Sequence, residues 1–239
     1  DILKEAGLPK GWCQAIICEN NLAEKLATDG RVNYVSFIGS AKVGWELKSK
    51  LAPGTRCALE HGGSAPVIVE EDSDLNDLLP ALCKGGFYHA GQVCVSVQRV
   101  YVHKSIVKSV SEGLSLLAKA LKVGDQLDKS TEVGPLILPS EVDRVELWVK
   151  EAIEEGAELL CGGKRISDTC YAPTVLLNPS VKSLVSTQEV FGPVVCVYSY
   201  SDRDEAIQLA NSLPYHFQAS VFTKNIDVAM DTVKKLNAA

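Results

Sequence analysis

One cysteine stands at a position where a thiol could carry out chemistry. Cys94 follows the Gly91-Gln92 pair, between a helix-like run and a strand-like run, and such a junction can aim an exposed thiol at a substrate. Glu60 stands just before Gly62-Gly63, at the end of an apolar run. A thiol and a carboxylate together suffice for covalent acyl chemistry, because the thiol attacks a carbonyl and the carboxylate activates the water that releases the product.

The remaining cysteines favour a structural interpretation. The chain has eight cysteines, with no C-x-x-C pair and no histidine cluster, so the sequence predicts no metal site. Several stand in apolar runs, such as Cys18 after Ile16-Ile17 and Cys196 after Val194-Val195. Reduced cysteines of this kind behave as small buried hydrophobic residues, which predicts a cytoplasmic protein.

Composition and charge bound the class of protein. The chain has 239 residues, of which 46% are hydrophobic, enough for one large domain or two smaller ones. Its formal net charge is −6 and it has no run rich in lysine and arginine, so nucleic acid is not an expected partner. No apolar run approaches the roughly 18 residues needed to span a bilayer, so no association with a membrane is expected.

The elements that position these residues are short strands alternating with amphipathic helices. Ser73 is expected to cap a helix that runs to about residue 89, and a candidate domain boundary lies near residues 60–63. The other expected helices cover residues 22–28, 41–51, 105–121, 139–155, 203–212 and 226–236. The expected strands cover residues 13–18, 32–37, 56–59, 66–69, 99–103, 174–177, 194–200 and 219–223. This alternation predicts an α/β fold with a largely parallel sheet flanked by helices.

A glycine-spaced turn joins the strand over 32–37 to the helix over 41–51. Gly39 and Gly44 flank the start of that helix, where free N–H groups and the helix dipole suit a pyrophosphate. Trp45 stands where a P-loop needs lysine, and the chain has no G-x-G-x-x-G motif. Taken alone, this turn is weak evidence for a phosphate site and favours a structural interpretation, in which a glycine packs against a neighbouring element.

Four motifs in one order carry a resemblance to a known family. Together they closely resemble the NAD(P)-dependent aldehyde dehydrogenase superfamily, and the resemblance covers essentially the whole chain. The motifs are Phe37-Ile38-Gly39-Ser40…Gly44, Leu59-Glu60-His61-Gly62-Gly63, Gly91-Gln92-Val93-Cys94 and Glu189-Val190-Phe191-Gly192-Pro193.

The resemblance implies a reaction that oxidises a small-molecule aldehyde to a carboxylic acid. Cys94 would be the nucleophile that attacks the aldehyde and then carries a thioester. Glu60 would be the general base that activates water for hydrolysis of that thioester. The backbone N–H of Cys94 would meet the oxyanion.

The resemblance also implies a site for NAD or NADP, with the choice between the two left open. Gly39, Ser40 and Gly44 would belong to that site, with Gly39 and Ser40 near the phosphates. Glu189 would hold the nicotinamide ribose, and Phe191 would pack beside the nicotinamide end.

The same resemblance implies a domain organisation. Residues 1–62 would be the C-terminal part of an incomplete, Rossmann-like NAD(P)-binding domain. Residues 63–239 would be the catalytic domain without its final strand and its oligomerisation tail. The longer protein is expected to form a homodimer or homotetramer. Whether this chain alone is active is left open.

Two alternatives remain open at the level of sequence. In a CoA-acylating relative, CoA rather than water would take the acyl group, although Glu60 favours water. In a non-catalytic relic, the scaffold would serve a structural or interaction role, although Cys94 and Glu60 favour catalysis.

Overall fold

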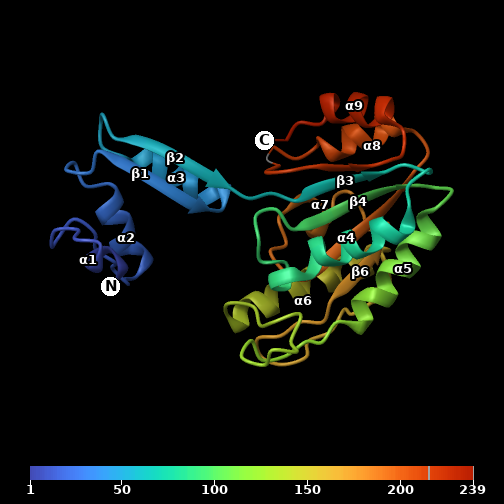
Figure 1. Cartoon of the computed structure of the whole chain (residues 1–239), viewed down its shortest axis with the longest axis horizontal. Helices are drawn as coiled ribbons and strands as arrows, with labels where there is room; N and C mark the ends of the chain where they lie inside the picture. Colours follow the sequence, from blue (N-terminus) through green and yellow to red (C-terminus); the bar gives the residue numbers. More distant parts are fainter. Residues whose placement is uncertain (215, 239) are drawn as a thin grey trace. The chain divides into compact units, whose positions relative to one another are not determined.

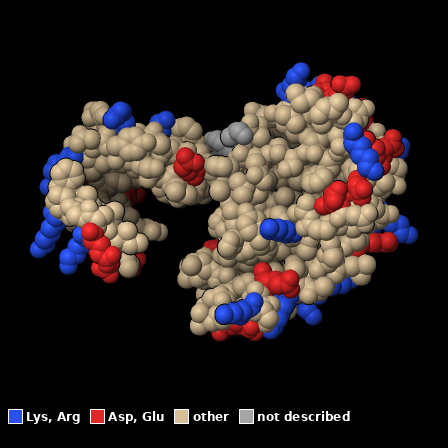
Figure 2. Space-filling model, in the orientation of Figure 1, with Lys and Arg blue, Asp and Glu red and all other residues tan. Residues whose placement is uncertain are grey.

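A computed structural model describes residues 1–214 and 216–238 of the chain. The chain divides into two compact units, Asp1–His61 and Gly62–Ala239. Charged side chains of both signs occur on the visible face of each unit (Figure 2). Within the described residues, no helix combines the length and the apolar character needed to cross a membrane.

The first unit is a small βαβ arrangement preceded by two helices (Figure 1). Strands β1 and β2 pair in parallel, and α3 connects them. Gly44 is the only described residue of this unit that is buried, so the unit has almost no hydrophobic core of its own. Its elements are α1 (Ile2–Glu5), α2 (Asn20–Ala27), β1 (Tyr34–Gly39), α3 (Ala41–Lys50) and β2 (Arg56–His61).

The strand expected over residues 13–18 is wrong. The structure has no strand there, and the side chains of Ile16 and Ile17 are exposed. An apolar run becomes a strand only where a neighbouring strand accepts its hydrogen bonds, and within the described residues this run has no such neighbour.

The second unit is built on a six-stranded sheet with the order β5-β6-β7-β4-β3-β8. Every neighbouring pair is parallel except β5 with β6, so the predicted α/β fold with a largely parallel sheet is confirmed. Its strands are β3 (Ala65–Val69), β4 (Val97–His103), β5 (Glu158–Cys161), β6 (Thr174–Leu177), β7 (Val194–Tyr200) and β8 (Ser220–Phe222). Its helices are α4 (Leu75–Phe87), the 3₁₀ turn η1 (Tyr88–Gly91), α5 (Val107–Ala120), α6 (Pro139–Glu154), α7 (Leu184–Thr187), α8 (Arg203–Ala210) and α9 (Ile226–Lys235).

Helices cover this sheet and close its core. Helices α4 and α5 lie side by side and pack on the central strands, while α8 packs on β3 and β4 (Figure 1). The central strands are buried over almost their whole length, because parallel strands covered by helices are apolar on both faces. This buried sheet fixes the first residues of β3, β4 and β7, and each motif of the second unit ends just before one of these strands.

The helix expected to follow Ser73 begins one residue later and ends earlier than predicted. Asp74 is the N-cap, and its carboxylate accepts from the Asn76 N–H at 2.9 Å. The α-helix ends at Phe87, because Tyr88 is extended and His89 and Ala90 lie in the left-handed region. That early end shapes the loop that carries Cys94.

Candidate active site

The loop before Cys94 is held in an uncommon backbone conformation. His89, Ala90 and Gly91 have φ values of 50°, 56° and 72°, so three successive residues lie in the left-handed region. That region costs free energy for residues that have a Cβ. The surrounding packing must hold this reversal of the chain in place.

Cys94 lies in a tight turn just beyond that reversal. The Ser96 N–H donates to the Val93 carbonyl at 2.9 Å and closes the turn. The Ser96 hydroxyl donates to the Gly85 carbonyl at 3.3 Å, which ties the turn to α4. The Cys94 thiol is half-buried, and no described residue accepts a hydrogen bond from its backbone N–H. The turn therefore presents a thiol beside an open N–H donor.

Gln92 fixes the loop from its other side. Its Nε2 donates to the Pro135 carbonyl at 3.1 Å, and its Oε1 accepts from the Ile137 N–H at 2.9 Å. These bonds join the loop to the segment that leads into α6. Beside them lies an open cavity of about 920 Å³, whose lining includes Gln92, Val93 and Phe191.

Glu189 is brought against the second glycine pair, although the two are far apart in sequence. The Gly63 N–H donates to Glu189 Oε1 at 3.1 Å. A Cβ at Gly62 would collide with the same carboxylate, so only glycine allows this approach. Burial raises the pKa of the Glu189 carboxyl above its ordinary value, while the Gly63 hydrogen bond and the nearby Arg144 act in the opposite direction.

The Glu189–Pro193 motif also touches the Cys94 loop. A Cβ at Gly91 would collide with the Gly192 carbonyl, so the two backbones are in direct contact. Phe191 has a φ of 46° and its side chain is 41% exposed, and Arg144 Nη2 donates to the Val190 carbonyl at 2.7 Å. The second unit thus brings together Gly62-Gly63, the Cys94 loop and the Glu189 motif.

Replacing Gly91 with alanine should destabilise the second unit and disturb Cys94. The added Cβ meets the Gly192 carbonyl, and the φ of 72° is itself unfavourable for alanine. We expect a loss of about 3 kcal/mol in the free energy of unfolding and a fall in melting temperature of at least about 6 °C. Thermal unfolding followed by circular dichroism measures this loss.

Gly156→Ala is the matched control for Gly91→Ala. Gly156 has a φ of 105°, and no atom lies within 4 Å of the place that a Cβ would take there, so alanine adds backbone strain without a collision. We expect a loss of about 1 kcal/mol and an unchanged reactivity of Cys94. Equal losses for the two variants would contradict the close contact between Gly91 and Gly192.

The other predicted residues belong to the first unit. Ser40 is the N-cap of α3, and its hydroxyl accepts from the Val43 N–H at 3.4 Å. Gly39 ends β1 just before this cap, and Gly44 packs against the ring of His61, as the structural interpretation of the turn expects. Glu60 is exposed on β2, in register with Ile38 of β1.

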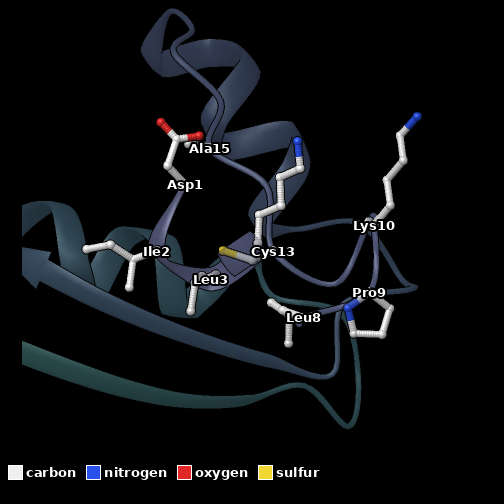
Figure 3. Close-up of a pocket in the computed structure, with 10 residues that line it drawn as sticks. Asp1, Ile2, Leu3, Leu8, Pro9, Lys10, Cys13 and Ala15 are labelled. Carbon is white, nitrogen blue, oxygen red and sulfur yellow. The ribbon is translucent and has the colours of Figure 1, made fainter. Parts of the chain in front are cut away.

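A second cavity lies wholly within the first unit and has none of the predicted site residues in its lining. It is lined by Asp1, Ile2, Leu3, Lys4, Leu8, Pro9, Lys10, Gly11, Cys13 and Ala15 (Figure 3). Within the described residues, no group of three or more His, Cys, Asp or Glu side chains is arranged to hold a metal ion.

Sequence reasoning missed the side chains that hold these motifs in place. The sequence marks Gln92 only as part of a motif and gives no role to Arg144 or to Gln98, whose side-chain amide bonds to the backbone on both sides of Glu189. A signal was present for Gln98, since a glutamine inside a run of valines is a buried polar residue that requires partners. The partners themselves lie far along the chain and cannot be identified from one sequence.

Comparison with known proteins finds the same family that the four motifs indicate. A model of the aldehyde dehydrogenase family matches residues 1–239. The 3-sulfolactaldehyde dehydrogenase of Priestia aryabhattai is 39% identical over 237 residues, which are 99% of this chain and 49% of that protein. The chain therefore spans about half the length of this curated relative.

Solved structures show the same relationship. Glyceraldehyde-3-phosphate dehydrogenase GapN of Methanocaldococcus jannaschii, complexed with NADP, matches with a TM-score of 0.93 and 36% identity over 99% of this chain and 51% of that one. Betaine aldehyde dehydrogenase of Staphylococcus aureus, in complex with NAD⁺, matches with a TM-score of 0.94 and 33% identity over 100% of this chain and 49% of that one. The resemblance carried by the motifs is confirmed, and the chain belongs to the aldehyde dehydrogenase family.

Proposed function

We propose that the protein oxidises a small-molecule aldehyde to a carboxylic acid with NAD or NADP, through a thioester on Cys94. The observation that carries this proposal is the loop around Cys94. A half-buried thiol lies in a turn whose backbone contacts the Glu189 motif, and that motif in turn contacts Gly62-Gly63. Residues 1–62 would serve as part of the cofactor-binding domain, and residues 63–239 as the catalytic domain.

Cys94 acts as the nucleophile in this proposal. Its sulfur attacks the aldehyde carbon and forms a thiohemiacetal, and the negative charge develops on the former carbonyl oxygen. The backbone N–H of Cys94 is free to donate to that oxygen, because no described residue accepts from it. Such a preorganised donor stabilises the charge without further rearrangement.

Glu60 acts as the general base that completes the cycle. Its carboxylate takes a proton from water, and the resulting hydroxide attacks the thioester and releases the carboxylic acid. This assignment is supported by the family and by the position of Glu60 two residues before the glycine pair that binds Glu189. An exposed carboxylate on a strand is accessible to water.

Residues of each unit, taken separately, suit parts of a dinucleotide. The N-terminus of α3 offers N–H groups beside Gly39 and Ser40 that suit phosphate oxygens, with Gly44 packing the helix onto its unit. Glu189 keeps a carboxylate oxygen that Gly63 does not use, which suits the hydroxyl groups of a ribose. The exposed ring of Phe191 supplies an apolar surface for the nicotinamide end. NAD or NADP, when bound, would accept the hydride whose loss converts the thiohemiacetal on Cys94 into the thioester.

Cofactor binding should weaken as the pH falls. The pKa of Glu189 is raised by burial, so its carboxyl gains a proton at a higher pH than an exposed glutamate. A protonated carboxyl accepts hydrogen bonds less well, so we expect the cofactor KM to increase between pH 7 and pH 5. Glu189→Gln should show a high KM at both values.

Glu205→Gln is the control for this pH dependence, because Glu205 is exposed on α8. The cofactor KM of this variant should equal that of the unmodified protein at both pH values. A cofactor KM that does not change with pH in the unmodified protein would contradict the role of Glu189.

The proposed activity is tested on the natural full-length protein and, in parallel, on this chain alone. Each is mixed with NAD or NADP and a panel of aldehydes, including lactaldehyde and betaine aldehyde. The full-length protein should reduce the cofactor and release the carboxylic acid in equal amounts. Acyl-CoA formation on addition of CoA would instead indicate the CoA-acylating alternative, and no turnover with any aldehyde would favour a non-catalytic scaffold.

We further propose a cytoplasmic homodimer or homotetramer. All eight cysteines are free thiols, which suits a reducing compartment. The first unit exposes large apolar side chains, including Ile38 and Trp45, that an assembly could cover. Light scattering coupled to size-exclusion chromatography and cell fractionation test these two points.

A further inference from the structure

Gln98 is a buried polar side chain in an apolar strand. It lies near the start of β4 and is 4% exposed. Its Nε2 donates to the carbonyls of Val185 and Gln188, each at 2.8 Å, and its Oε1 accepts from the Val190 N–H at 2.8 Å. Both N–H groups of the amide and its oxygen are therefore used, all by backbone groups of one segment.

Two of those three bonds flank Glu189, and the third reaches Val185 in the preceding helix. Gln188 and Val190 are the two neighbours of Glu189 in the chain, and Glu189 stands beyond the short helix α7 and before β7. The segment between those elements has no sheet ladder to hold it. Gln98 therefore supplies hydrogen bonds that a strand neighbour would otherwise supply.

The Glu189 carboxylate has little else to fix its direction. Its one hydrogen bond among the described residues comes from the Gly63 N–H. Arg144 also holds this segment, through the Val190 carbonyl. If the peptide groups around Glu189 shift, the carboxylate turns away, and a displacement of about 1 Å is enough to impair a positioned group.

We propose that Gln98 is a positioning residue that fixes Glu189 for cofactor binding, which rests on the proposed role of Glu189 in holding the nicotinamide ribose. Gln98 does not touch the cofactor. It acts on cofactor affinity by holding the backbone on both sides of the carboxylate.

Gln98→Met in the full-length protein removes all three hydrogen bonds at nearly constant side-chain size. We expect the dissociation constant for NAD or NADP, measured by calorimetry, to rise about tenfold. The aldehyde KM and the rate at which iodoacetamide labels Cys94 without cofactor should stay within about twofold. Gln98→Asn, which keeps the amide but shortens its reach, is measured in the same way should the methionine variant fail to fold.

Thr232→Val is the matched control for a general loss of stability. Thr232 is fully buried on α9, and its hydroxyl donates to the Val228 carbonyl at 2.8 Å. This variant loses a buried side-chain hydrogen bond elsewhere in the second unit and should keep the cofactor dissociation constant. An equal weakening of cofactor binding in both variants would overturn the inference, because the effect would then follow stability.

A double-mutant cycle with Glu189→Ala separates the inference from the proposed function. If Gln98 acts through Glu189, then Gln98→Met should change the dissociation constant by less than about twofold once Glu189 is alanine. Full additivity would overturn the positioning role, as would normal cofactor binding by Gln98→Met beside weakened binding by Glu189→Ala. Normal binding by Glu189→Ala would overturn the cofactor role of Glu189 itself.

Discussion

Replacing Cys94 with alanine should lower kcat/KM of the full-length protein by at least about 10⁴-fold, because the proposed reaction passes through a thioester on the Cys94 sulfur. The fold should be preserved, since the thiol is half-buried in a turn that backbone groups close. A spectrophotometric assay of cofactor reduction measures the loss, and calorimetry with NAD or NADP should show that cofactor binding remains.

The matched control is Cys57→Ala. Cys57 is half-buried, as Cys94 is, but stands on β2 and has no proposed part in the chemistry. Burial raises the pKa of the thiols of Cys83, Cys161 and Cys196, the last to about 12, so these residues are poor nucleophiles. Normal turnover by Cys94→Ala would contradict the proposed mechanism outright.

Replacing Glu60 with glutamine should separate the two halves of the reaction. Thioester formation needs Cys94, whereas its hydrolysis needs the base, so we expect one rapid turnover per site followed by a slow phase. The rate of the slow phase should be lower than the steady-state rate of the unmodified protein by about 10²- to 10⁴-fold, which is the usual contribution of a general base. Stopped-flow measurement of cofactor reduction resolves both phases.

Glu5→Gln on α1 is the control, as an exposed glutamate in the same unit. Its steady-state rate should equal that of the unmodified protein. Added hydroxylamine should accelerate the slow phase of Glu60→Gln, because it attacks a thioester without needing a base. A Glu60→Gln protein with normal steady-state turnover would show that another group activates the water.

The elements that the sequence predicted best are those whose bounds follow from the burial of their own side chains. Strands β6 and β7 have the predicted bounds, because short, largely apolar runs buried on both faces have few alternatives. Strand β5 was not predicted. It is a short antiparallel edge strand with an exposed start, so its pairing with β6 depends on tertiary contact more than on its own pattern.

The same distinction applies to the candidate site, where some features follow from the local sequence and others depend on tertiary contacts. The Gly91-Gln92 pair correctly indicates a turn before Cys94. The left-handed His89 and Ala90 could not be predicted, because both residue types ordinarily favour φ below zero and only the surrounding packing holds them there. The contact between Gly91 and Gly192 likewise joins motifs that only the folded sheet brings together.

The most direct test of the proposed mechanism is to locate the acyl group on the protein. Full-length Glu60→Gln is mixed with NAD or NADP and an aldehyde, quenched in acid and digested for peptide mass spectrometry. The proposed mechanism predicts that the peptide containing Cys94 gains the mass of the aldehyde less two hydrogen atoms, in near-stoichiometric amount. An acyl group on another cysteine, or cofactor reduction with no acylated peptide, would contradict it.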